Sequence, residues 1–376
     1  MCGKTGILHA PGKPLPRVEI GLGKGNPVNS GPDLAELREL AQIGEEALTI
    51  YAKHCVAFLL SYRVLDVMAS LVPGTHVFPC CKTWMAVTST AMTDRGSARS
   101  KMNNPNWLWP GGKRIAVIFN VCLEAWSDGK APGISPMGNP LPAGVLDTMA
   151  ISWAAYGVKT GIYRLLDAFQ RHGAKASVMV NAVIAERAPE AVRAVAEAGH
   201  EVLSHSYAMD VIPALLSDED ERKNIARCTE LLAHASGKKI QGWLSPRGTS
   251  KASTPKLLAE AGYRWYGDVF DADLPYVLTF GAQKLVAIPL SYDVNDMPSM
   301  KYGSAPKAMH DAFEEVVAIA RERDGELRII DVTSHAHIFG HHRGAYHYEK
   351  IIEKAVSAPD IWVGTRAQVA EHVLAH

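Results

Sequence analysis

Apolar and polar residues follow one another differently in the two parts of this chain. From Trp107 onward, short apolar runs alternate with amphipathic segments, which is typical of a parallel sheet built from strand–helix–strand units. The runs that predict strands are Arg114 to Val121, Ala176 to Asn181, Glu201 to His205, Ile240 to Leu244, a short one near Trp265, Leu285 to Leu290, Leu327 to Val332, and Ile361 to Val363.

The amphipathic segments between these strands predict helices with recognisable ends. The first has its apolar residues at helical spacing from Ile162 to Phe169 and ends at Gly173. A second begins at Pro189 and ends before Gly199, and a third begins after Ser217, whose hydroxyl can cap free amides. Roughly seven or eight such units over about 270 residues predict a closed or slightly broken β/α barrel, with a doubly wound open sheet as the alternative.

Residues 1 to about 103 show no such alternation. This part has Gly/Pro punctuation up to Pro32, one possible helix from Asp33 to Leu60, and a tail rich in Ser, Thr and Arg. It is interpreted as a small accessory domain, a loosely ordered extension, or the product of a start assigned too early, with Met92 or Met102 as the true start. The expected division is therefore an irregular extension over 1–103 and a barrel over 104–376.

Composition narrows the class of protein. With 376 residues and 47% hydrophobic content, the chain can bury a full core. Lys plus Arg equals Asp plus Glu at 39 each, so no basic excess favours nucleic acid as a partner. The six cysteines show no C-x-x-C spacing, which favours reduced thiols and the cytoplasm. The first twenty residues lack the apolar run of an export signal, and Arg63 and Asp66 interrupt the most apolar early stretch, so no membrane contact is expected.

Polar residues recur where the predicted strands end. Because the carboxyl ends of barrel strands meet at one mouth, side chains placed there can form a site. Each of them alone could be a turn or cap residue, but their recurrence predicts an active site at this end. They are Glu124, Asn181, His205, Arg247, Asp268, Asp271, Asp273, Asp293, Asn295, Asp296, His335 and His337.

Six segments resemble, in order, the motif series of polysaccharide deacetylases of the nodulation-protein-B type. They are WPGGKRIAVIFNV, AGHEVLSHSYAMD, GWLSPRG, DADLPY, SYDVNDM and DVTSHAHIFG. Within that family they are most similar to the branch of deacetylase-like allantoinases and cyclic-amide hydrolases. The resemblance implies a deformed (β/α) barrel of the polysaccharide-deacetylase type and the hydrolysis of non-peptide carbon–nitrogen bonds.

The family's metal site takes an Asp after the first strand and two histidines in an H-S/T-x-x-H motif. Here His205 is kept, Met209 stands at the second histidine position, and Glu124 replaces the acid. Glu124 and Asp210 could join His205 around one divalent zinc, or His337 could supply the missing nitrogen, and zinc would then activate water. The alternative is that no cofactor is required, as the resemblance to the allantoinase-like branch implies.

The resemblance also implies roles for other residues. His335 matches the family's general acid, which would protonate the leaving nitrogen. Arg247 matches the arginine of the allantoinase-like branch and is assigned to substrate binding. Asp273 and Asn295 either bind substrate or order their own loops. The resemblance leaves open which residue is the general base that activates water; Glu124 is the first choice and Asp210 the second. The expected catalytic residues are Glu124, His205 and His335.

These observations favour a hydrolase of a small cyclic amide or ureide, such as allantoin, a hydantoin or an imide. One alternative is an N-deacetylase of an N-acetylated carbohydrate, and another is an inactive barrel that binds a ligand. The expected partner is a small-molecule amide substrate, with the enzyme forming a homo-oligomer in the cytoplasm.

Overall fold

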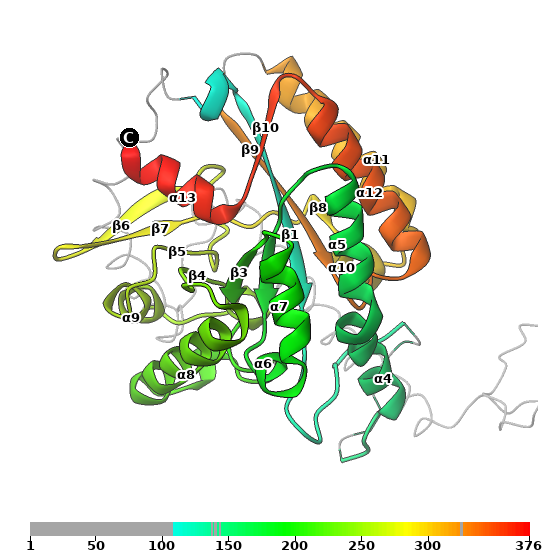
Figure 1. The fold of residues 1–376 in the computed structure, drawn as a ribbon, viewed down its shortest axis with the longest axis vertical. Helices are drawn as coiled ribbons and strands as arrows, with labels where there is room; N and C mark the ends of the chain where they lie inside the picture. Colours follow the sequence, from blue (N-terminus) through cyan, green and yellow to red (C-terminus); the bar gives the residue numbers. More distant parts are fainter. Residues whose placement is uncertain (1–107, 137, 139–140, 143, 324–325) are drawn as a thin grey trace, which may run out of the picture. The chain divides into compact units, whose positions relative to one another are not determined.

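The computed structural model describes residues 108–136, 138, 141–142, 144–323 and 326–376 (Figure 1). The extension predicted over 1–103, its helix between Asp33 and Leu60, and the alternative starts at Met92 and Met102 lie outside these residues. Their interpretations, and the boundary between extension and barrel, stay predictions.

A mostly parallel sheet forms the centre of the fold. Its strand order is β6-β7-β5-β4-β3-β2-β1-β9-β8, with β10 paired to the first half of β1, and only the β6–β7 pair is antiparallel. No pairing joins β6 to β8 in the described part of the chain, so the barrel is unclosed, as the sequence predicted for a deformed barrel. The strands are β1 (Ile115–Leu123), β2 (Ser177–Val180), β3 (Glu201–Ser204), β4 (Gly242–Trp243), β5 (Trp265–Tyr266), β6 (Tyr276–Phe280), β7 (Gln283–Ala287), β8 (Val294–Asn295), β9 (Arg328–His335) and β10 (Ile361–Gly364).

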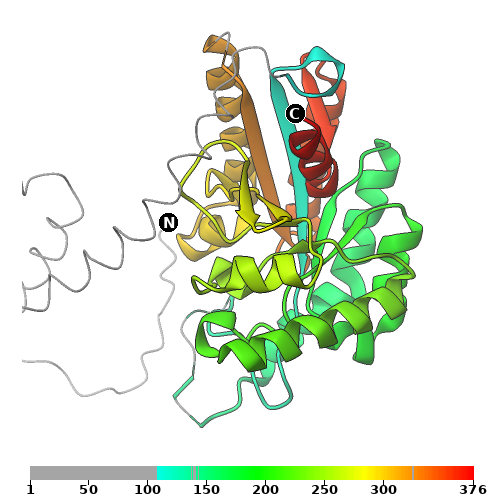
Figure 2. The same ribbon diagram turned by 90° about the vertical axis from the view of Figure 1, so that its left-hand side faces the viewer.

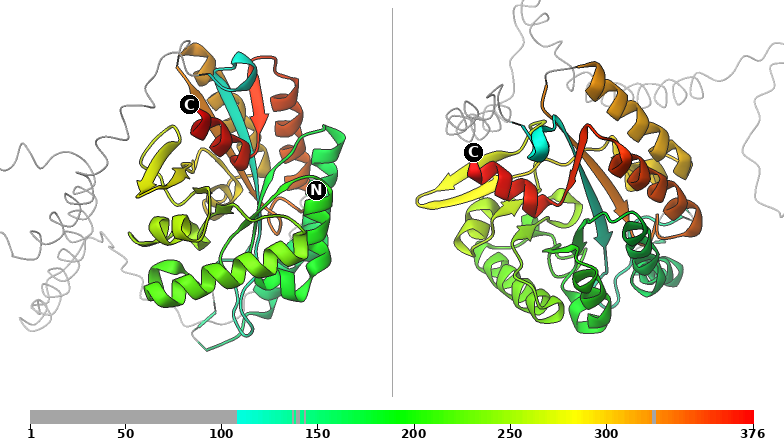
Figure 3. Two further views of the ribbon diagram at one scale, coloured as in Figure 1. Left: turned by 60° about the vertical axis from the view of Figure 1, so that its left-hand side comes forward. Right: turned by 45° about the horizontal axis from the view of Figure 1, so that its top comes forward.

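Helices surround the sheet on its outer side, as Figures 2 and 3 show from three directions. The α-helices are α4 (Thr148–Tyr156), α5 (Ile162–Arg171), α6 (Val183–Arg187), α7 (Pro189–Glu197), α8 (Asp218–Ser236), α9 (Thr254–Glu260), α10 (Asp296–Lys301), α11 (Pro306–Glu322), α12 (His342–Ser357) and α13 (Arg366–Ala375). Single turns occur at η2 (Pro110–Gly112), η4 (Pro213–Leu215) and η5 (Pro246–Gly248), and a π-helical turn, η3 (Gly157–Gly161), joins α4 to α5. None of the helices in these ranges is both long and apolar enough to cross a membrane.

Strand β1 is buried on both faces, which explains its unbroken apolar sequence. Val117, Phe119 and Val121 belong to the core between the sheet and the outer helices, whereas Ile118 and Cys122 belong to the core inside the barrel. Since side chains alternate along a strand, the residue two positions after Cys122 continues the inner face. This is how Glu124 comes to point into the barrel mouth.

The inner core also holds a buried guanidinium. Arg366, fully buried at the start of α13, donates from Nε to Asn120 Oδ1 at 2.8 Å and from Nη1 to the Ile288 carbonyl at 3.0 Å. It is also ion-paired with Asp331. A charge inside the barrel is tolerated because it has hydrogen-bond partners on strands β1 and β9 and on the segment after β7.

The sequence predicted eight of the ten strands and the three helices that it singled out. The Ser217 hydroxyl accepts from the Asp220 amide at 3.1 Å and caps α8, as expected. Two strands were missed. β8 is only two residues long, and β6 forms a hairpin with β7 around Gly281, whose φ of +61° suits a tight turn.

Candidate active site

Four of the residues predicted at strand ends meet at one mouth of the barrel. Glu124 directly follows β1, His205 directly follows β3, and His335 is the last residue of β9. The parallel pairing of β1 and β9 places Cys122 opposite His335, which brings His337 and Glu124 to the same region. The sheet therefore gathers residues that are more than 200 positions apart in the sequence.

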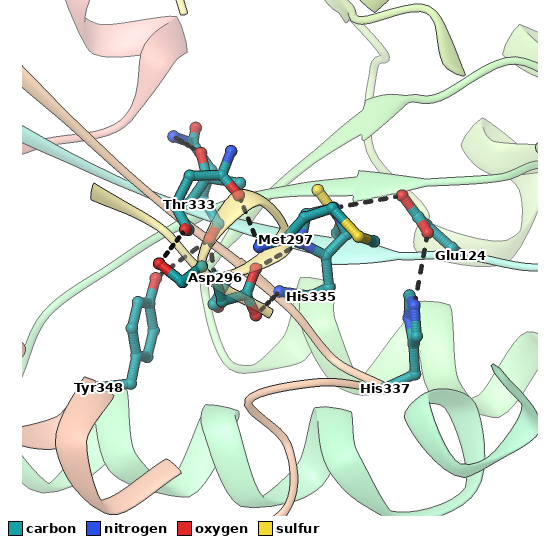
Figure 4. A network of polar contacts seen from close by, with 12 residues as sticks. Glu124, Asp296, Met297, Thr333, His335, His337 and Tyr348 are labelled. Carbon is teal, nitrogen blue, oxygen red and sulfur yellow. Dashed lines mark hydrogen bonds and ion pairs between the residues drawn. The ribbon is translucent and has the colours of Figure 1, made fainter. Parts of the chain in front are cut away.

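A buried carboxylate stands among three imidazoles. Glu124 is only 3% exposed. Its Oε1 lies 3.6 Å from His205 Nε2 and 3.5 Å from His335 Nε2, and its Oε2 lies 3.8 Å from His337 Nε2. Figure 4 shows Glu124 lying between His335 and His337. This arrangement concentrates one negative charge and up to three proton-transfer groups in a small volume.

Asp296 sets the orientation of His335. This aspartate is fully buried at the start of α10, and its Oδ1 lies 2.6 Å from His335 Nδ1 while its Oδ2 accepts from the His335 backbone N–H at 2.7 Å (Figure 4). A carboxylate can only accept from Nδ1, so Nδ1 carries a proton and Nε2 faces Glu124. The two bonds fix both the ring and the backbone of His335.

His205 is oriented in a similar way by a backbone group. Its Nδ1 lies 2.6 Å from the Leu244 carbonyl, so Nδ1 is the donor and Nε2 is left facing Glu124. Asn181, which follows β2, donates to the His205 carbonyl and accepts from the Ala125 amide at 3.0 Å. Asn181 thus ties the loop after β1 to the loop after β3.

His337 is buried beside Glu124 and packs against aromatic and backbone groups. It is 1% exposed, and neither ring nitrogen has a hydrogen-bond partner among the residues described. The Trp153 ring lies edge-on to it with centroids 4.4 Å apart. The π-helical turn packs against the backbone of Ala336 and His337. A Cβ added at Gly157 would lie 2.9 Å from the His337 amide nitrogen, and a Cβ added at Gly161 would lie 2.0 Å from the Ala336 carbonyl oxygen. Only glycine fits at these two positions.

The charges of the site follow from its burial and its neighbours. Burial alone would raise the pKa of Glu124, but His335, His205 and His337 lower it to about 2. Burial would lower the pKa of His335, but Cys122, Asp296 and Glu124 raise it well above the ordinary value. Burial lowers the pKa of His337 to about 4. At neutral pH the site therefore holds a carboxylate at Glu124, an imidazolium at His335 and a neutral imidazole at His337.

A cavity of about 530 Å³ opens beside Glu124. Its walls come from the loop after β1, from α4, from the π-helical turn and from α6. Apolar side chains from α4 and α6 line it together with Trp126, and charged side chains also line it. The charged lining residues besides Glu124 are Asp128, Lys130, Lys159, Arg187 and Glu190.

Other predicted site residues have structural partners or lie apart. Asp210 accepts from the Ser127 amide at 2.8 Å and so orders the loop after β1. Asn295 caps α10 by accepting from the Met297 amide at 3.0 Å. Asp273 lines a second cavity of about 500 Å³, whose lining does not include Glu124. Arg247 lies exposed in η5 with φ of +61°. Substrate-binding roles for Arg247, Asp273 and Asn295 stay predictions.

Sequence reasoning assigned no role to two residues that the structure brings to the centre of the site. Asp296 was recognised as a strand-end residue, but its pairing with His335 depends on β8 lying beside β9. Cys122 directly follows the apolar run from Arg114 to Val121 and was assigned no function. Its partner His335 lies opposite it in the β1–β9 register, which no local pattern reveals.

The expected zinc ligands do not gather into one group. Among the described residues, the only three or more His, Cys, Asp or Glu side chains whose ligand atoms all lie within 4.8 Å of one another are Cys122, Glu124 and His335. His205 and Asp210 are in no such group. With Met209 at the second histidine position, the donor set of the family's metal site does not fit these residues. Whether the reaction needs a divalent metal stays a prediction.

Comparison with known proteins agrees with the fold and with the family resemblance. The family model "Polysaccharide deacetylase" matches residues 153–266. A candidate polysaccharide deacetylase of Schizosaccharomyces pombe (strain 972 / ATCC 24843) is 25% identical over 304 residues, which cover 70% of this chain and 91% of that protein.

Two solved structures have the same fold over most of their length. The crystal structure of a probable polysaccharide deacetylase from Pseudomonas aeruginosa PAO1 is 26% identical, with a TM-score of 0.65 over 71% of this chain and 93% of that one. The crystal structure of Puue allantoinase is 24% identical, with a TM-score of 0.65 over 72% and 93% of the two chains. This chain is therefore similar in sequence to polysaccharide deacetylases and shares the fold of these two structures, and these relatives indicate an amide-hydrolysing enzyme.

Proposed function

We propose that this enzyme opens the ring of a small cyclic amide or ureide, such as allantoin, a hydantoin or an imide. The observation that carries the proposal is the buried pair formed by Glu124 and His335, 3.5 Å apart, of which Glu124 lines a cavity of about 530 Å³. One member is a carboxylate and the other an imidazolium, which is the combination that amide hydrolysis requires.

Glu124 acts as the general base in this mechanism. The carboxylate removes a proton from water as the water attacks the amide carbonyl. His205 Nε2 lies 3.6 Å from Glu124 Oε1 and holds the carboxylate beside the attacking water. His205 is thus a positioning residue for the attacking water.

His335 acts as the general acid. The tetrahedral intermediate collapses by breaking the carbon–nitrogen bond, and Nε2 of His335 protonates the departing nitrogen, since an amide anion is too basic to leave. In a cyclic substrate the new carboxylate and the new amino or ureido group remain in one molecule. The proton held by Glu124 then returns to His335 across the 3.5 Å gap, which restores both groups.

The shape and lining of the cavity suit a small polar ring. Volumes of about 300–1,000 Å³ are usual for small-molecule sites, and about 530 Å³ lies within this range. Trp126 supplies a flat apolar wall, and Lys130 and Lys159 supply positive charge beside it, whereas Arg187 is ion-paired with Asp128. A ring with several carbonyl or carboxylate oxygens would find partners in this lining.

N-deacetylation of an N-acetylated carbohydrate is the second candidate. The matching family model and the name of the Schizosaccharomyces pombe relative favour it. The same acid and base would serve, but the products differ. Deacetylation releases acetate and leaves a free amine, whereas ring opening adds one water and releases nothing.

The two candidates separate in a substrate screen of the full chain. We expect allantoin, a hydantoin or a cyclic imide to gain the mass of one water by mass spectrometry, with and without chelator. His335→Gln should slow this conversion by about 10²-fold or more, and His342→Gln, which replaces an exposed residue of the same segment, should leave it unchanged. Acetate release from chito-oligosaccharides without any ring opening would overturn the first candidate in favour of the second. The expected homo-oligomer and cytoplasmic location stay predictions.

A further inference from the structure

We propose that Cys122, Glu124 and His335 form a binding site for a thiophilic divalent cation such as Zn²⁺ or Cd²⁺, and that the bound cation inhibits the enzyme. The site differs from the zinc site that the family resemblance implies, because His205 and Asp210 take no part in it. Binding can be tested without a substrate, whereas inhibition rests on the proposed function.

The three ligand atoms are already near the spacing of a metal site. They lie within 4.8 Å of one another, and all three residues are buried. Tetrahedral zinc with bonds of about 2.3 Å to sulfur and about 2.0–2.2 Å to nitrogen and oxygen keeps its ligand atoms roughly 3.3–3.6 Å apart. Glu124 Oε1 and His335 Nε2 have this separation at 3.5 Å. A small inward shift of the Cys122 thiol would complete a three-ligand face.

The surroundings of the ligands support a cation at this point. Metal-bound histidines usually donate their second ring N–H to a carboxylate or carbonyl, and His335 Nδ1 lies 2.6 Å from Asp296 Oδ1. In addition, Glu124 Oε2 is buried and has no hydrogen-bond partner in the described ranges. A bound cation would give this carboxylate a partner in addition to the three imidazoles.

The donor set selects a thiophilic cation. Thiolate and imidazole ligands favour Zn²⁺ and its heavier relative Cd²⁺ over Mg²⁺ or Ca²⁺, which prefer oxygen ligands. The Met179 thioether sulfur, 3.5 Å from Cys122 Sγ, adds a further soft donor beside the site. On binding, the Cys122 thiol and Nε2 of His335 each lose a proton to solvent, and the metal–sulfur and metal–nitrogen bonds form.

Inhibition follows from which atoms the cation occupies. Glu124 lines the cavity of about 530 Å³, so a hydrated cation can reach it. The cation would bind His335 Nε2, the atom that protonates the leaving nitrogen, and an oxygen of Glu124, the base. Cys122 neither gives nor takes a proton in the proposed reaction, so the metal site and the proton transfers share two residues and differ in the third.

Cadmium titration of the full chain tests binding directly. Thiolate–Cd²⁺ bonds absorb in the ultraviolet, and we expect wild type to show about one more cadmium–thiolate equivalent per chain than Cys122→Ser. Cys228→Ser is the matched control, because Cys228 is also a buried free cysteine. It should keep the full wild-type absorbance. The four cysteines outside the described residues are present in every sample and cancel in the comparison. Equal absorbance in wild type and Cys122→Ser would overturn the site.

Activity measurements test inhibition separately. With a turned-over substrate, Zn²⁺ or Cd²⁺ should lower wild-type turnover at least tenfold, and a chelator should restore it. Cys122→Ser should require at least about tenfold more metal than wild type for the same fractional inhibition, with each protein measured against its own turnover without metal. Stimulation of wild type by the metal would overturn the inhibitory role. If no substrate is turned over, the proposed function fails while the cadmium spectrum still decides the site. Thermal melts of both serine variants confirm that they are folded.

Discussion

Acid should destabilise this enzyme through His200, and the structure indicates by how much. His200 precedes β3, is 5% exposed, and accepts from the Ala176 amide at 2.9 Å through Nδ1. Burial, together with the charge of Lys175, lowers the pKa of His200 to about 4. The ring is therefore neutral in the folded enzyme at neutral pH.

The direction of the effect follows from this lowered pKa. The unfolded chain binds a proton at His200 near pH 6.5, whereas the folded enzyme binds it only near pH 4. Stability from the neutral ring is thus fully present above about pH 6.5 and is lost as the pH falls toward 4. The pKa difference of about 2.5 between the unfolded and folded states corresponds to roughly 3.4 kcal/mol of folding stability. About 2 kcal/mol of this stability is lost by pH 5.

His200→Asn isolates this contribution. The Asn oxygen can replace Nδ1 as the acceptor for the Ala176 amide, but the side chain does not titrate. We expect the free energy of unfolding, measured by urea denaturation, to fall about 2 kcal/mol more in wild type than in His200→Asn between pH 7.5 and pH 5.

The control variant is His234→Asn, which replaces an exposed histidine in the last turn of α8. It should follow the wild-type pH dependence. Parallel pH profiles for wild type and His200→Asn would refute the reasoning, since they would mean that His200 takes up its proton equally in the folded and unfolded states.

Four further predictions concern the site. His335→Ala should lower kcat by about 10²-fold or more with little change in KM, and His337→Ala should do less; a rise in KM alone for His335→Ala would reassign it to substrate binding. Asp296→Asn should lower kcat by about 10²-fold, because the Nδ1 proton of His335 loses its carboxylate; unchanged kcat in steady-state assays would contradict the pairing. Turnover should survive dialysis against a chelator, and loss of activity restored by zinc would show a catalytic metal. Gly161→Ala should destabilise the enzyme by about 1 to 3 kcal/mol in urea denaturation, since its Cβ would overlap the Ala336 carbonyl, and wild-type stability would show that the turn can shift.

The sequence by itself determined the barrel, the order of its strands along the chain and the residues at their ends. The apolar run of β1 and the capped start of α8 at Ser217 are set by local patterns. Glu124, His205 and His335 were therefore recognisable as candidate site residues, because each one closely follows or ends an apolar run and that relation is local.

Only the tertiary structure decided which of these residues act together. The position of Cys122 opposite His335 depends on the register between β1 and β9, and the contact of Asp296 with His335 depends on β8 lying beside β9. Both pairings join segments far apart in the sequence, and strand alternation constrains the face on which a side chain lies but not its neighbour on the next strand. The burial of His337 likewise depends on the π-helical turn with Gly157 packing against it. The proposed acid, its orienting carboxylate and the proposed metal site are consequences of packing between distant strands.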